Sequence, residues 1–265
     1  MTDAECVELL QWAMPRLGLR WRGFSQLRRQ VCRRIATRAK ELGLDATAYR
    51  ERLEVDPTEL ERFDAMCFVT ISRFYRDAAT FDALADRLGA LGAGGDTLRV
   101  WSAGCASGEE PYTVAMLASD PERRIDLVRP MEIIATDRDE AVLSRAAAGR
   151  YGASSLRELP ERLRVVGFDG DGVRPAIRAR VRFVRADVRT FVPPLPLHVV
   201  LCRNVVFSYF DEATQLAFAE RVAGSLAPGG LLVVGKGESV PGDAFVPTDA
   251  PLIWRASRGT PSSSR

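Results

Sequence analysis

Residues 100–111, VWSAGCASGEEP, decide the fold class. The apolar run LRVWSA at 98–103 has the length of a strand and leads directly into a turn of small residues that Gly104 and Gly108 flank. Glycine lets the backbone approach a ligand closely, and a helix that begins after the turn presents its free N–H groups to the same place. The pattern predicts a strand, a ligand-binding turn and a helix in succession.

Two acidic residues, Glu109 and Glu110, open the predicted helix. One interpretation is capping, because acidic side chains near a helix N-terminus stabilise the helix. The other is ligand binding. Two carboxylates repel a phosphate, so they disfavour a nucleotide phosphate loop, and they suit a cationic ligand such as one with a sulfonium and an ammonium group.

Short apolar runs alternate with helical stretches after residue 97. Such alternation predicts a parallel sheet with covering helices, and ligands of these sheets bind at the carboxyl ends of the strands. The expected strands, each buried on both faces, are 98–103, 131–136, 181–186, 197–202 and 231–235, and the expected helices are 109–119, 139–149 and 212–226.

Polar residues follow three more of the predicted strands. Asp137 ends the second strand, where an acid can bind both ribose hydroxyls; the alternative is an N-cap for the next helix. Asp187 and the backbone N–H of Val188 follow the strand at 181–186 and are expected to bind an adenine edge. Asn204 follows the strand at 197–202. Together with the glycine-rich turn, four strand ends predict one crevice.

The spacing of apolar residues and the turn motifs predict how the rest of the chain is organised into domains. Before residue 90, apolar residues recur at three- and four-residue spacing, as in Val31, Ile35 and Ala39, which predicts helices. A GDG turn between short apolar pieces predicts a β-hairpin inserted at 164–184. The expected organisation is a helical domain at 1–70, a linker helix at 71–96 that includes the turn GAGGD, an α/β domain at 97–257 and a disordered tail at 258–265.

Composition excludes several classes of protein. No run of eighteen apolar residues is present, so no membrane span is expected, and the first residues lack the apolar core of a signal peptide; cytoplasmic residence is the expectation. The five cysteines form no CxxC pair and the chain has one histidine, His198, so we expect reduced, partly buried thiols and no metal site. His198 lies in an apolar run and is expected to be buried, not catalytic.

The charge distribution points to an anionic partner. The net charge of +2 is too small to indicate nucleic acid by itself. Residues 16–40, however, carry nine arginine or lysine side chains and no acidic one. Such a block attracts nucleic acid, a lipid surface or an acidic protein.

Several motifs in order resemble one family. WSAGCASGEEPYTVAML, ATDRDEAVLSRA, LCRNVVFSYFDE and LAPGGLLVVGKGES, with FVTISRFYRD upstream, resemble the CheR-type chemotaxis receptor methyltransferases over roughly residues 60–256. The resemblance implies a class I S-adenosylmethionine-dependent methyltransferase fold, Rossmann-like, with a small N-terminal helical domain and an inserted β-subdomain. It also implies a protein-glutamate O-methyltransferase that forms methyl esters on receptor helices.

The resemblance assigns roles to individual residues. Arg76 and Tyr209 match the positions that act on the carboxylate and near the methyl group. Thr70 stands where the family commonly has Asn, Ser72 where it has Thr, and Lys236 where it has His, and one extra residue precedes Tyr209; these departures indicate a divergent branch. The implied cofactor-binding residues are Thr70, Ser72, Arg76, Gly104, Glu109, Glu110, Asp137, Asp187, Val188, Asn204 and Val205, and the residues expected to face an acidic substrate are Arg28, Arg29, Arg33 and Arg34.

The chemistry needs no catalytic histidine. A glutamate side chain, with an ordinary pKa of about 4.3, is ionised at neutral pH and attacks a methyl group without a general base. Orientation alone supplies roughly 7–11 kcal/mol. Arg76 is expected to hold the carboxylate, because a guanidinium binds a carboxylate bidentately. The alternative is a surface salt bridge with Asp77 or a neighbour.

Two alternatives to receptor methylation stay open. One is methyl transfer to a non-receptor protein or a small carboxylic acid. The other is a cofactor-binding regulatory module without turnover, whose basic N-terminal stretch contacts a partner or nucleic acid. Nucleic-acid methylation is disfavoured, because CRNVVF stands where an Asn/Asp-Pro-Pro-aromatic motif belongs. We expect a monomer that binds an acidic protein, without nucleic acid or membrane insertion.

Overall fold

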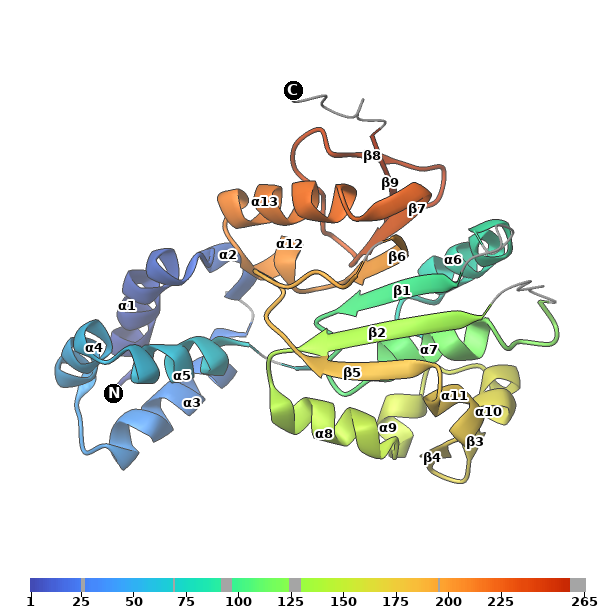
Figure 1. Ribbon diagram of the computed structural model, residues 1–265. Helices are drawn as coiled ribbons and strands as arrows, with labels where there is room; N and C mark the ends of the chain where they lie inside the picture. The colour runs from blue at the N-terminus through green and yellow to red at the C-terminus, as the bar shows by residue number, and fades with distance from the viewer. Residues whose placement is uncertain (25–26, 69, 92–96, 124–129, 195, 258–265) are drawn as a thin grey trace. The chain divides into compact units, whose positions relative to one another are not determined.

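The chain folds into two compact units. The smaller unit holds residues 1–70 and 208–214, and the larger unit holds the rest. The computed structural model shown in Figure 1 describes residues 1–24, 27–68, 70–91, 97–123, 130–194 and 196–257. The glycine-rich turn predicted at 92–96 and the tail predicted at 258–265 lie outside the described residues.

A seven-stranded sheet forms the centre of the larger unit. In spatial order its strands are β5 (Val181–Arg185), β2 (Met131–Asp137), β1 (Leu98–Ala103), β6 (Leu197–Cys202), β7 (Leu226–Val234), β9 (Ile253–Ala256) and β8 (Phe245–Pro247). The first five are mutually parallel. The chain runs outward from β1 to β2 and β5 on one side, and to β6 and β7 on the other. The order therefore reverses beside β1, where sheets of this type bind ligands.

The five predicted strands are present, and the Rossmann-like fold class is confirmed. Two features differ from the prediction. Strands β8 and β9 pair antiparallel at one edge, and the alternation of strands and helices in the sequence did not predict them. Strand β5 was expected to be buried on both faces, but it is the opposite edge of the sheet and its Arg182 and Arg185 are exposed.

Helices cover both faces of this sheet. Ser102, Ala135 and Phe183 are in register across β1, β2 and β5, and the ring of Phe183 contacts Tyr112 of α7 (Glu109–Leu117). Trp101 points to the other face, because successive side chains of a strand alternate. Its ring contacts Phe218 of α13 (Glu212–Ala223). Helix α8 (Glu140–Ala148) also packs on β2 and β5, as Figure 1 shows.

The predicted linker helix is part of the larger unit. Helix α6 (Ala78–Leu91) begins seven residues later than predicted. Its Phe81, Leu84 and Leu88 are buried in the same core as Val100 of β1 and Tyr112 of α7. The helix therefore packs as part of the α/β unit, because its apolar face needs the core for burial.

The predicted hairpin is narrower than 164–184. Only β3 (Phe168–Asp169) and β4 (Gly172–Val173) pair around the GDG turn. Helical turns α9 (Ala153–Leu156), α10 (Glu161–Gly167) and α11 (Pro175–Arg178) surround the pair, and residues 181–185 belong to the main sheet. Phe168 and Val173 are buried in the core of the larger unit. This core, and not a longer ladder of strand pairs, stabilises the insertion.

The smaller unit is helical. Thr2 and Glu5 form a capping box at α1, Asp45 caps α4, and Asp56 caps α5, where Pro57 occupies the first turn. The elements are α1 (Asp3–Ala13), the 3-10 turn η1 (Met14–Leu17), α2 (Trp21–Phe24), α3 (Arg28–Glu41), α4 (Ala46–Val55) and α5 (Pro57–Cys67); the short helix α12 (Val206–Tyr209) leads into residues 208–214.

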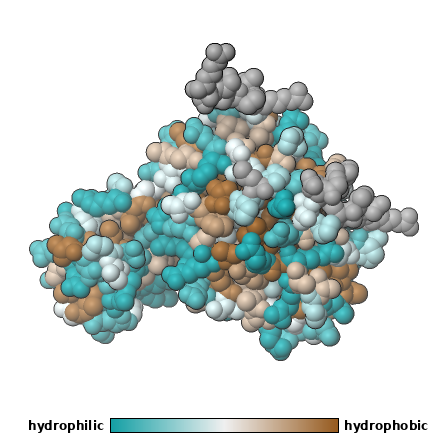
Figure 2. Space-filling model, in the orientation of Figure 1, coloured by the Kyte–Doolittle hydropathy of each residue, from teal (hydrophilic) through white to brown (hydrophobic). Residues whose placement is uncertain are grey.

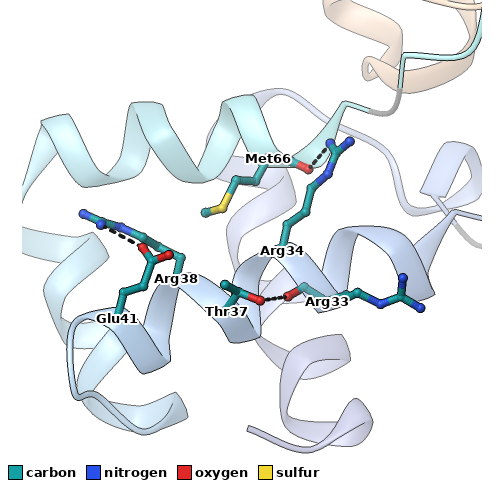
Figure 3. Close-up of a pocket in the computed structure, with 6 residues that line it drawn as sticks. All are labelled: Arg33, Arg34, Thr37, Arg38, Glu41 and Met66. Atoms are coloured by element: carbon teal, nitrogen blue, oxygen red, sulfur yellow. Dashed lines mark hydrogen bonds and ion pairs between the residues drawn. The ribbon is translucent and has the colours of Figure 1, made fainter.

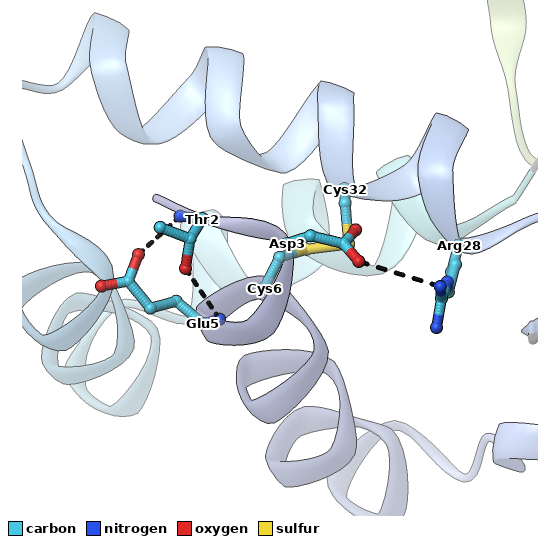
Figure 4. The surroundings of a disulfide bond; sticks show 6 residues. All are labelled: Thr2, Asp3, Glu5, Cys6, Arg28 and Cys32. Atoms are coloured by element: carbon cyan, nitrogen blue, oxygen red, sulfur yellow. Dashed lines mark hydrogen bonds and ion pairs between the residues drawn. A yellow bond between two sulfur atoms is a disulfide. The ribbon is translucent and has the colours of Figure 1, made fainter.

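A disulfide joins α1 to α3, contrary to the expectation that all five cysteines are reduced. Cys6 and Cys32 form this bond, shown in Figure 4 beside the ion pair of Asp3 and Arg28. Their Cα atoms lie 5.8 Å apart, within the range that a disulfide spans. The remaining cysteines, Cys67, Cys105 and Cys202, are buried thiols outside this disulfide. Two helices brought together by folding therefore create a pair that the spacing in the sequence did not reveal.

Exposed apolar side chains are scattered over the surface. Figure 2 shows hydrophobic residues interspersed among hydrophilic ones on the visible face. The large exposed ones among the described residues are Leu42, Val55, Ile71, Val165 and Val246. In the part of the chain that the structure describes, no helix has both the length and the apolar character needed to cross a lipid bilayer.

Candidate active site

The glycine-rich turn adopts a backbone that side chains disfavour. Gly104 and Gly108 have φ angles of +76° and +91°. A Cβ atom on Gly104 would lie 2.6 Å from the side chain of Val205, and one on Gly108 would lie 2.9 Å from Ala146 and Tyr151. The amides of Gly104 and Cys105 each donate to the carbonyl of Thr136 at 2.8 Å. The turn is thereby fixed against the ends of β2 and β6.

Asp137 binds the turn and does not cap α8. Its Oδ2 accepts a hydrogen bond from the Ala106 N–H at 3.0 Å, and its Oδ1 accepts one from the Asp139 N–H at 3.0 Å. The cap of α8 is Asp139, whose carboxylate accepts from Ala141 N–H. Burial raises the pKa of Asp137 above its ordinary value. The alternative interpretation of Asp137 as an N-cap is therefore wrong.

The two glutamates at the start of α7 are held inside the protein. Glu110 accepts from Ser102 Oγ at 2.7 Å and pairs with Arg203 at 3.4 Å. Glu109 is 4% exposed and accepts from Ser155 Oγ at 3.2 Å, and its Oε2 has no hydrogen-bond partner among the described residues. Burial raises the pKa of both carboxyl groups. Capping alone does not explain why Glu109 is buried and Glu110 is only 12% exposed, because an exposed acid at the same helix position caps equally well.

Asp187 is engaged by a neighbouring arginine. Its carboxylate accepts hydrogen bonds from the Arg189 side chain at 2.6 Å and from the Arg189 N–H at 2.8 Å. Burial opposes ionisation here, but these hydrogen bonds and the charge of Arg189 outweigh it and lower the pKa of Asp187. Val188, which follows, is buried. Asp187 therefore stays ionised at the carboxyl end of β5.

Glu238 organises the end of β6 and was missed in the sequence. Asn204 has a φ of +58°, and its N–H donates to Glu238 Oε2 at 3.0 Å. The N–H of Gly235 donates to the same oxygen at 2.5 Å. Val205 then packs against Gly104. The signal available in the sequence was an acidic residue four positions after the end of β7, but only the fold brings it to Asn204.

Arg203 was also missed, although it immediately precedes Asn204. Its side chain is 5% exposed and forms ion pairs with Asp77 at 2.7 Å and with Glu110 at 3.4 Å. It also donates to the carbonyl of Arg76 at 2.8 Å, and its guanidinium lies 4.9 Å from the ring centre of Phe81. An arginine after a buried strand was the available signal. Its partners are more than 90 residues away in the chain.

No carboxylate among the described residues neutralises the positive charge of Arg76. Its guanidinium donates only to the carbonyl of Ile71 at 3.3 Å, and it forms no ion pair among the described residues. The alternative of a salt bridge with Asp77 is wrong, because Asp77 pairs with Arg203. Burial raises the pKa of Glu109, and the Ser72 side chain partly opposes this rise.

Thr70 and Tyr209 both belong to the smaller unit. Thr70 is exposed. The ring of Tyr209 packs against Phe24 and Phe68, with ring centres 5.1 and 5.7 Å apart. Their predicted roles beside the methyl group and the cofactor stay predictions.

The four predicted substrate-binding arginines of α3 differ in their surroundings. Arg29 and Arg33 are exposed and have no ion-pair partner among the described residues. Arg28 lies 3.9 Å from Asp3. Arg34 donates to the carbonyls of Phe68 at 2.6 Å and Met66 at 3.4 Å, so its charge stabilises the end of α5.

An open groove of about 370 Å³ lies between α3 and α5 in the smaller unit. Figure 3 shows Arg34 reaching the end of α5 across this groove, whereas the Arg33 side chain points away. The lining residues are Arg33, Arg34, Thr37, Arg38, Glu41 and Met66.

The acidic residues at the predicted crevice of the larger unit suit a cationic ligand. Glu109, Glu110 and Asp137 are carboxylates with raised pKa values at the strand ends, and Arg203 is the cation that pairs with one of them. The buried Glu109 Oε2 has no hydrogen-bond partner in the part of the chain that the structure describes. A bound positive charge would stabilise the ionised acids. The described residues contain no group of three side chains arranged to hold a metal ion.

Comparison with known proteins gives one consistent family. The family described as "CheR methyltransferase, SAM binding domain" matches residues 70–250. The chemotaxis protein methyltransferase of Listeria monocytogenes is 32% identical over 231 residues, covering 76% of this chain and 86% of that protein. That of Escherichia coli is 33% identical over 231 residues, covering 80% of this chain and 77% of that protein.

Other similar proteins are longer or more distant. An uncharacterised 104.1 kDa protein of Rhodobacter capsulatus is 33% identical over 88% of this chain, which spans 25% of that protein. The glycopeptide N-methyltransferase MtfA, solved with sinefungin, is 17% identical over 62% of this chain and 54% of that chain, with a TM-score of 0.37. The match over residues 70–250 and the similarity to the Listeria protein show that the chain belongs to the CheR methyltransferase family.

Proposed function

We propose that this protein transfers the methyl group of S-adenosylmethionine to glutamate side chains of a chemoreceptor. The observation that carries the proposal is Arg76, a guanidinium without an ion-pair partner among the described residues. Its own carbonyl is bonded to Arg203, which in turn pairs with Glu110 of the acidic crevice. A cation that binds carboxylate is thus tied to a site that suits a cationic cofactor.

S-adenosylmethionine is the cofactor of this family, and the residues of the crevice fit it. When bound, it supplies an electrophilic methyl group on a positively charged sulfur. In this proposal Asp137 accepts hydrogen bonds from the ribose hydroxyls, and Glu109 and Glu110 stabilise the positive charges of the methionine part. Asp187 and Val188 are proposed for the adenine, and Asn204 and Val205 close the other side of the glycine-rich turn.

The reaction balances without a general base. A glutamate oxygen forms a bond to the methyl carbon, and the bond from that carbon to sulfur breaks with its electron pair going to sulfur. The products are a glutamate methyl ester and neutral S-adenosylhomocysteine, and no proton moves. Arg76 holds the carboxylate in line, which is the orientation effect worth roughly 7–11 kcal/mol, and Tyr209 is proposed to approach the same carboxylate.

The substrate class rests on charge and on the relatives. Arg29 and Arg33 present exposed guanidinium groups on α3, which suits an acidic helix. The Listeria and E. coli relatives are named chemotaxis protein methyltransferases. Arg28 and Arg34 contribute less in this proposal, because each already contacts another group of the smaller unit.

The test combines a product assay with two variants. Purified protein is incubated with methyl-labelled S-adenosylmethionine and cytoplasmic fragments of the chemoreceptors encoded in the same genome. Base-labile label on glutamates, located by mass spectrometry, is the expected result. Label on another protein or on a small carboxylic acid would identify that molecule as the acceptor and refute receptor methylation. Cofactor binding without any labelled product would indicate a regulatory module without turnover.

The variants separate cofactor from acceptor. Asp137→Ala is expected to abolish calorimetric binding of S-adenosylhomocysteine, and Arg76→Ala to preserve it while removing transfer. Arg73→Ala is the matched control, because Arg73 lies in the same segment but pairs with Glu158 at 2.9 Å. Normal turnover of Arg76→Ala would refute the role of Arg76, and unchanged affinity in Asp137→Ala would refute the cofactor site.

A further inference from the structure

We propose that Arg203 is a positioning residue that holds the Arg76 segment against the acidic crevice. The inference rests on the proposed function for the role of Arg76 as carboxylate holder. Arg203 itself is 5% exposed on its side chain, so it acts through its neighbours.

The segment that carries Arg76 has an unfavourable backbone. Tyr75 and Asp77, on either side of Arg76, have φ angles of +58° and +63°. Residues with a side chain adopt this left-handed region only where surrounding contacts enforce it. The segment therefore depends on its tethers to keep the Arg76 guanidinium in one place.

Arg203 supplies two of these tethers with one nitrogen. Its Nη2 donates to the carbonyl of Arg76 at 2.8 Å and to Asp77 Oδ2 at 2.7 Å. A further tether joins the Tyr75 N–H to Thr113 Oγ1 of α7 at 3.2 Å. The contacts of Arg203 thus act on the backbone unit that bears the proposed carboxylate holder and on the strained residue after it.

The other nitrogen of Arg203 connects this segment to the crevice. Nη1 lies 3.4 Å from Glu110 Oε2, and the guanidinium plane rests over Phe81 of α6. One planar group therefore joins the Arg76 segment, α6 and the first turn of α7. This arrangement fixes the acceptor-binding cation relative to the cofactor-binding acid, and methyl transfer depends on that relation because its reacting atoms must lie in line.

Lysine cannot replace this geometry. A guanidinium has a rigid fork of donors, whereas an ammonium is a single point of charge on a flexible stem. Arg203→Lys therefore keeps the positive charge near Asp77 and Glu110 but loses the span between them. Asp77→Asn is the complementary variant, since it weakens the same tether while Arg203 and Glu110 stay in place.

The first experiment follows the segment itself, by hydrogen exchange of the full-length protein without substrate. We expect faster amide exchange in residues 72–78 in Arg203→Lys and in Asp77→Asn. The matched control is Arg87→Lys, which disturbs a different ion pair of the larger unit, with Asp249 at 2.6 Å. Unchanged exchange at 72–78 in both test variants would overturn the inference. This measurement is independent of the acceptor, so it remains decisive if the proposed function fails.

The second experiment is a double-mutant cycle on methyl transfer, with the chemoreceptor fragments as acceptor. Arg203→Lys is expected to lower kcat/KM for the acceptor by about 10- to 100-fold, the range that a misplacement of about 1 Å produces. In an Arg76→Lys background, whose residual transfer can be measured, the same change should have almost no further effect, because the guanidinium that Arg203 positions is absent. Effects that multiply across the cycle would show that Arg203 acts independently of Arg76. If the unaltered protein methylates only another acceptor, and the expected coupling between Arg203 and Arg76 is found with that acceptor, the receptor assignment is overturned and the positioning role stands.

Discussion

Gly108→Ala tests whether the glycine-rich turn needs its backbone shape. Gly108 has a φ of +91°, and an added methyl group would lie 2.9 Å from the Ala146 Cβ, 2.9 Å from the Tyr151 Oη and 3.2 Å from Phe183. Ala146 cannot yield by rotation, because its Cβ is fixed to the backbone of α8. Two separate penalties therefore add: the left-handed conformation and the overpacking.

The magnitude follows from these two penalties. A residue with a side chain in the left-handed region costs about 1–2 kcal/mol, and overpacking a filled core costs about 1–3 kcal/mol. We expect the free energy of unfolding to fall by about 2–5 kcal/mol. For a domain of this size that corresponds to a decrease in Tm of about 4–20 °C. S-adenosylhomocysteine affinity should fall as well, because Glu109 follows directly.

The assay is thermal unfolding of Gly108→Ala beside a matched glycine variant. Gly152 has a φ of −83°, and an added Cβ there meets nothing within 4 Å. Gly152→Ala is therefore expected to change the unfolding free energy by no more than about 0.5 kcal/mol, as a surface change does. Equal unfolding temperatures for the two variants would refute the reasoning about the turn.

Three further predictions concern charge and cross-linking. Glu59 is buried and accepts hydrogen bonds from Arg38 and Tyr49, and the hydrogen bond from Arg38 is the main cause of its lowered pKa. The ionised Glu59 therefore stabilises the smaller unit fully above the ordinary pKa of a glutamate. This stabilisation is lost as the pH falls through the lower pKa of Glu59 in the folded protein. Glu59→Gln should destabilise the smaller unit by about 3 kcal/mol at neutral pH and flatten this acid dependence in urea titrations; an unchanged acid limb would contradict the assignment. The raised pKa values of Glu109, Glu110 and Asp137 predict that S-adenosylmethionine binds more weakly as the pH falls through these pKa values, and that its binding releases protons. Calorimetry in buffers of different ionisation enthalpy measures the proton release. Binding without proton release would contradict the placement of these acids beside the cation. Reduction of the Cys6–Cys32 bond should expose two additional thiols to alkylation and lower the stability of the smaller unit by about 3 kcal/mol, whereas Cys67→Ala should leave the alkylation difference unchanged.

Local pattern was sufficient for the parts of the fold that depend on neighbours in the chain. Runs such as LRVWSA and LHVVLC became β1 and β6, because continuous apolar stretches of strand length are buried wherever they pair. The glycine-rich turn and Asp137 were predictable for the same reason: carboxyl ends of parallel strands meet at one edge, so polar residues placed there converge. His198 is buried in β6, as its apolar surroundings predicted.

Only the tertiary structure decided which distant groups meet. The pair of Cys6 and Cys32 depends on how α1 packs on α3, and the extent of the insertion depends on Phe168 and Val173 finding the core of the larger unit. The antiparallel β8 and β9 needed an available sheet edge.

The segment VWSAGCASGEEP separates most clearly what the sequence determined from what the tertiary structure decided. Its residues alone indicated a strand, a tight turn and an acidic helix start, because those features follow from local backbone and side-chain preferences. They did not indicate that Glu110 pairs with Arg203, or that Arg203 also binds the segment of Arg76. Those contacts join positions more than 90 residues apart, and a long-range ion pair leaves no periodic trace in a single sequence.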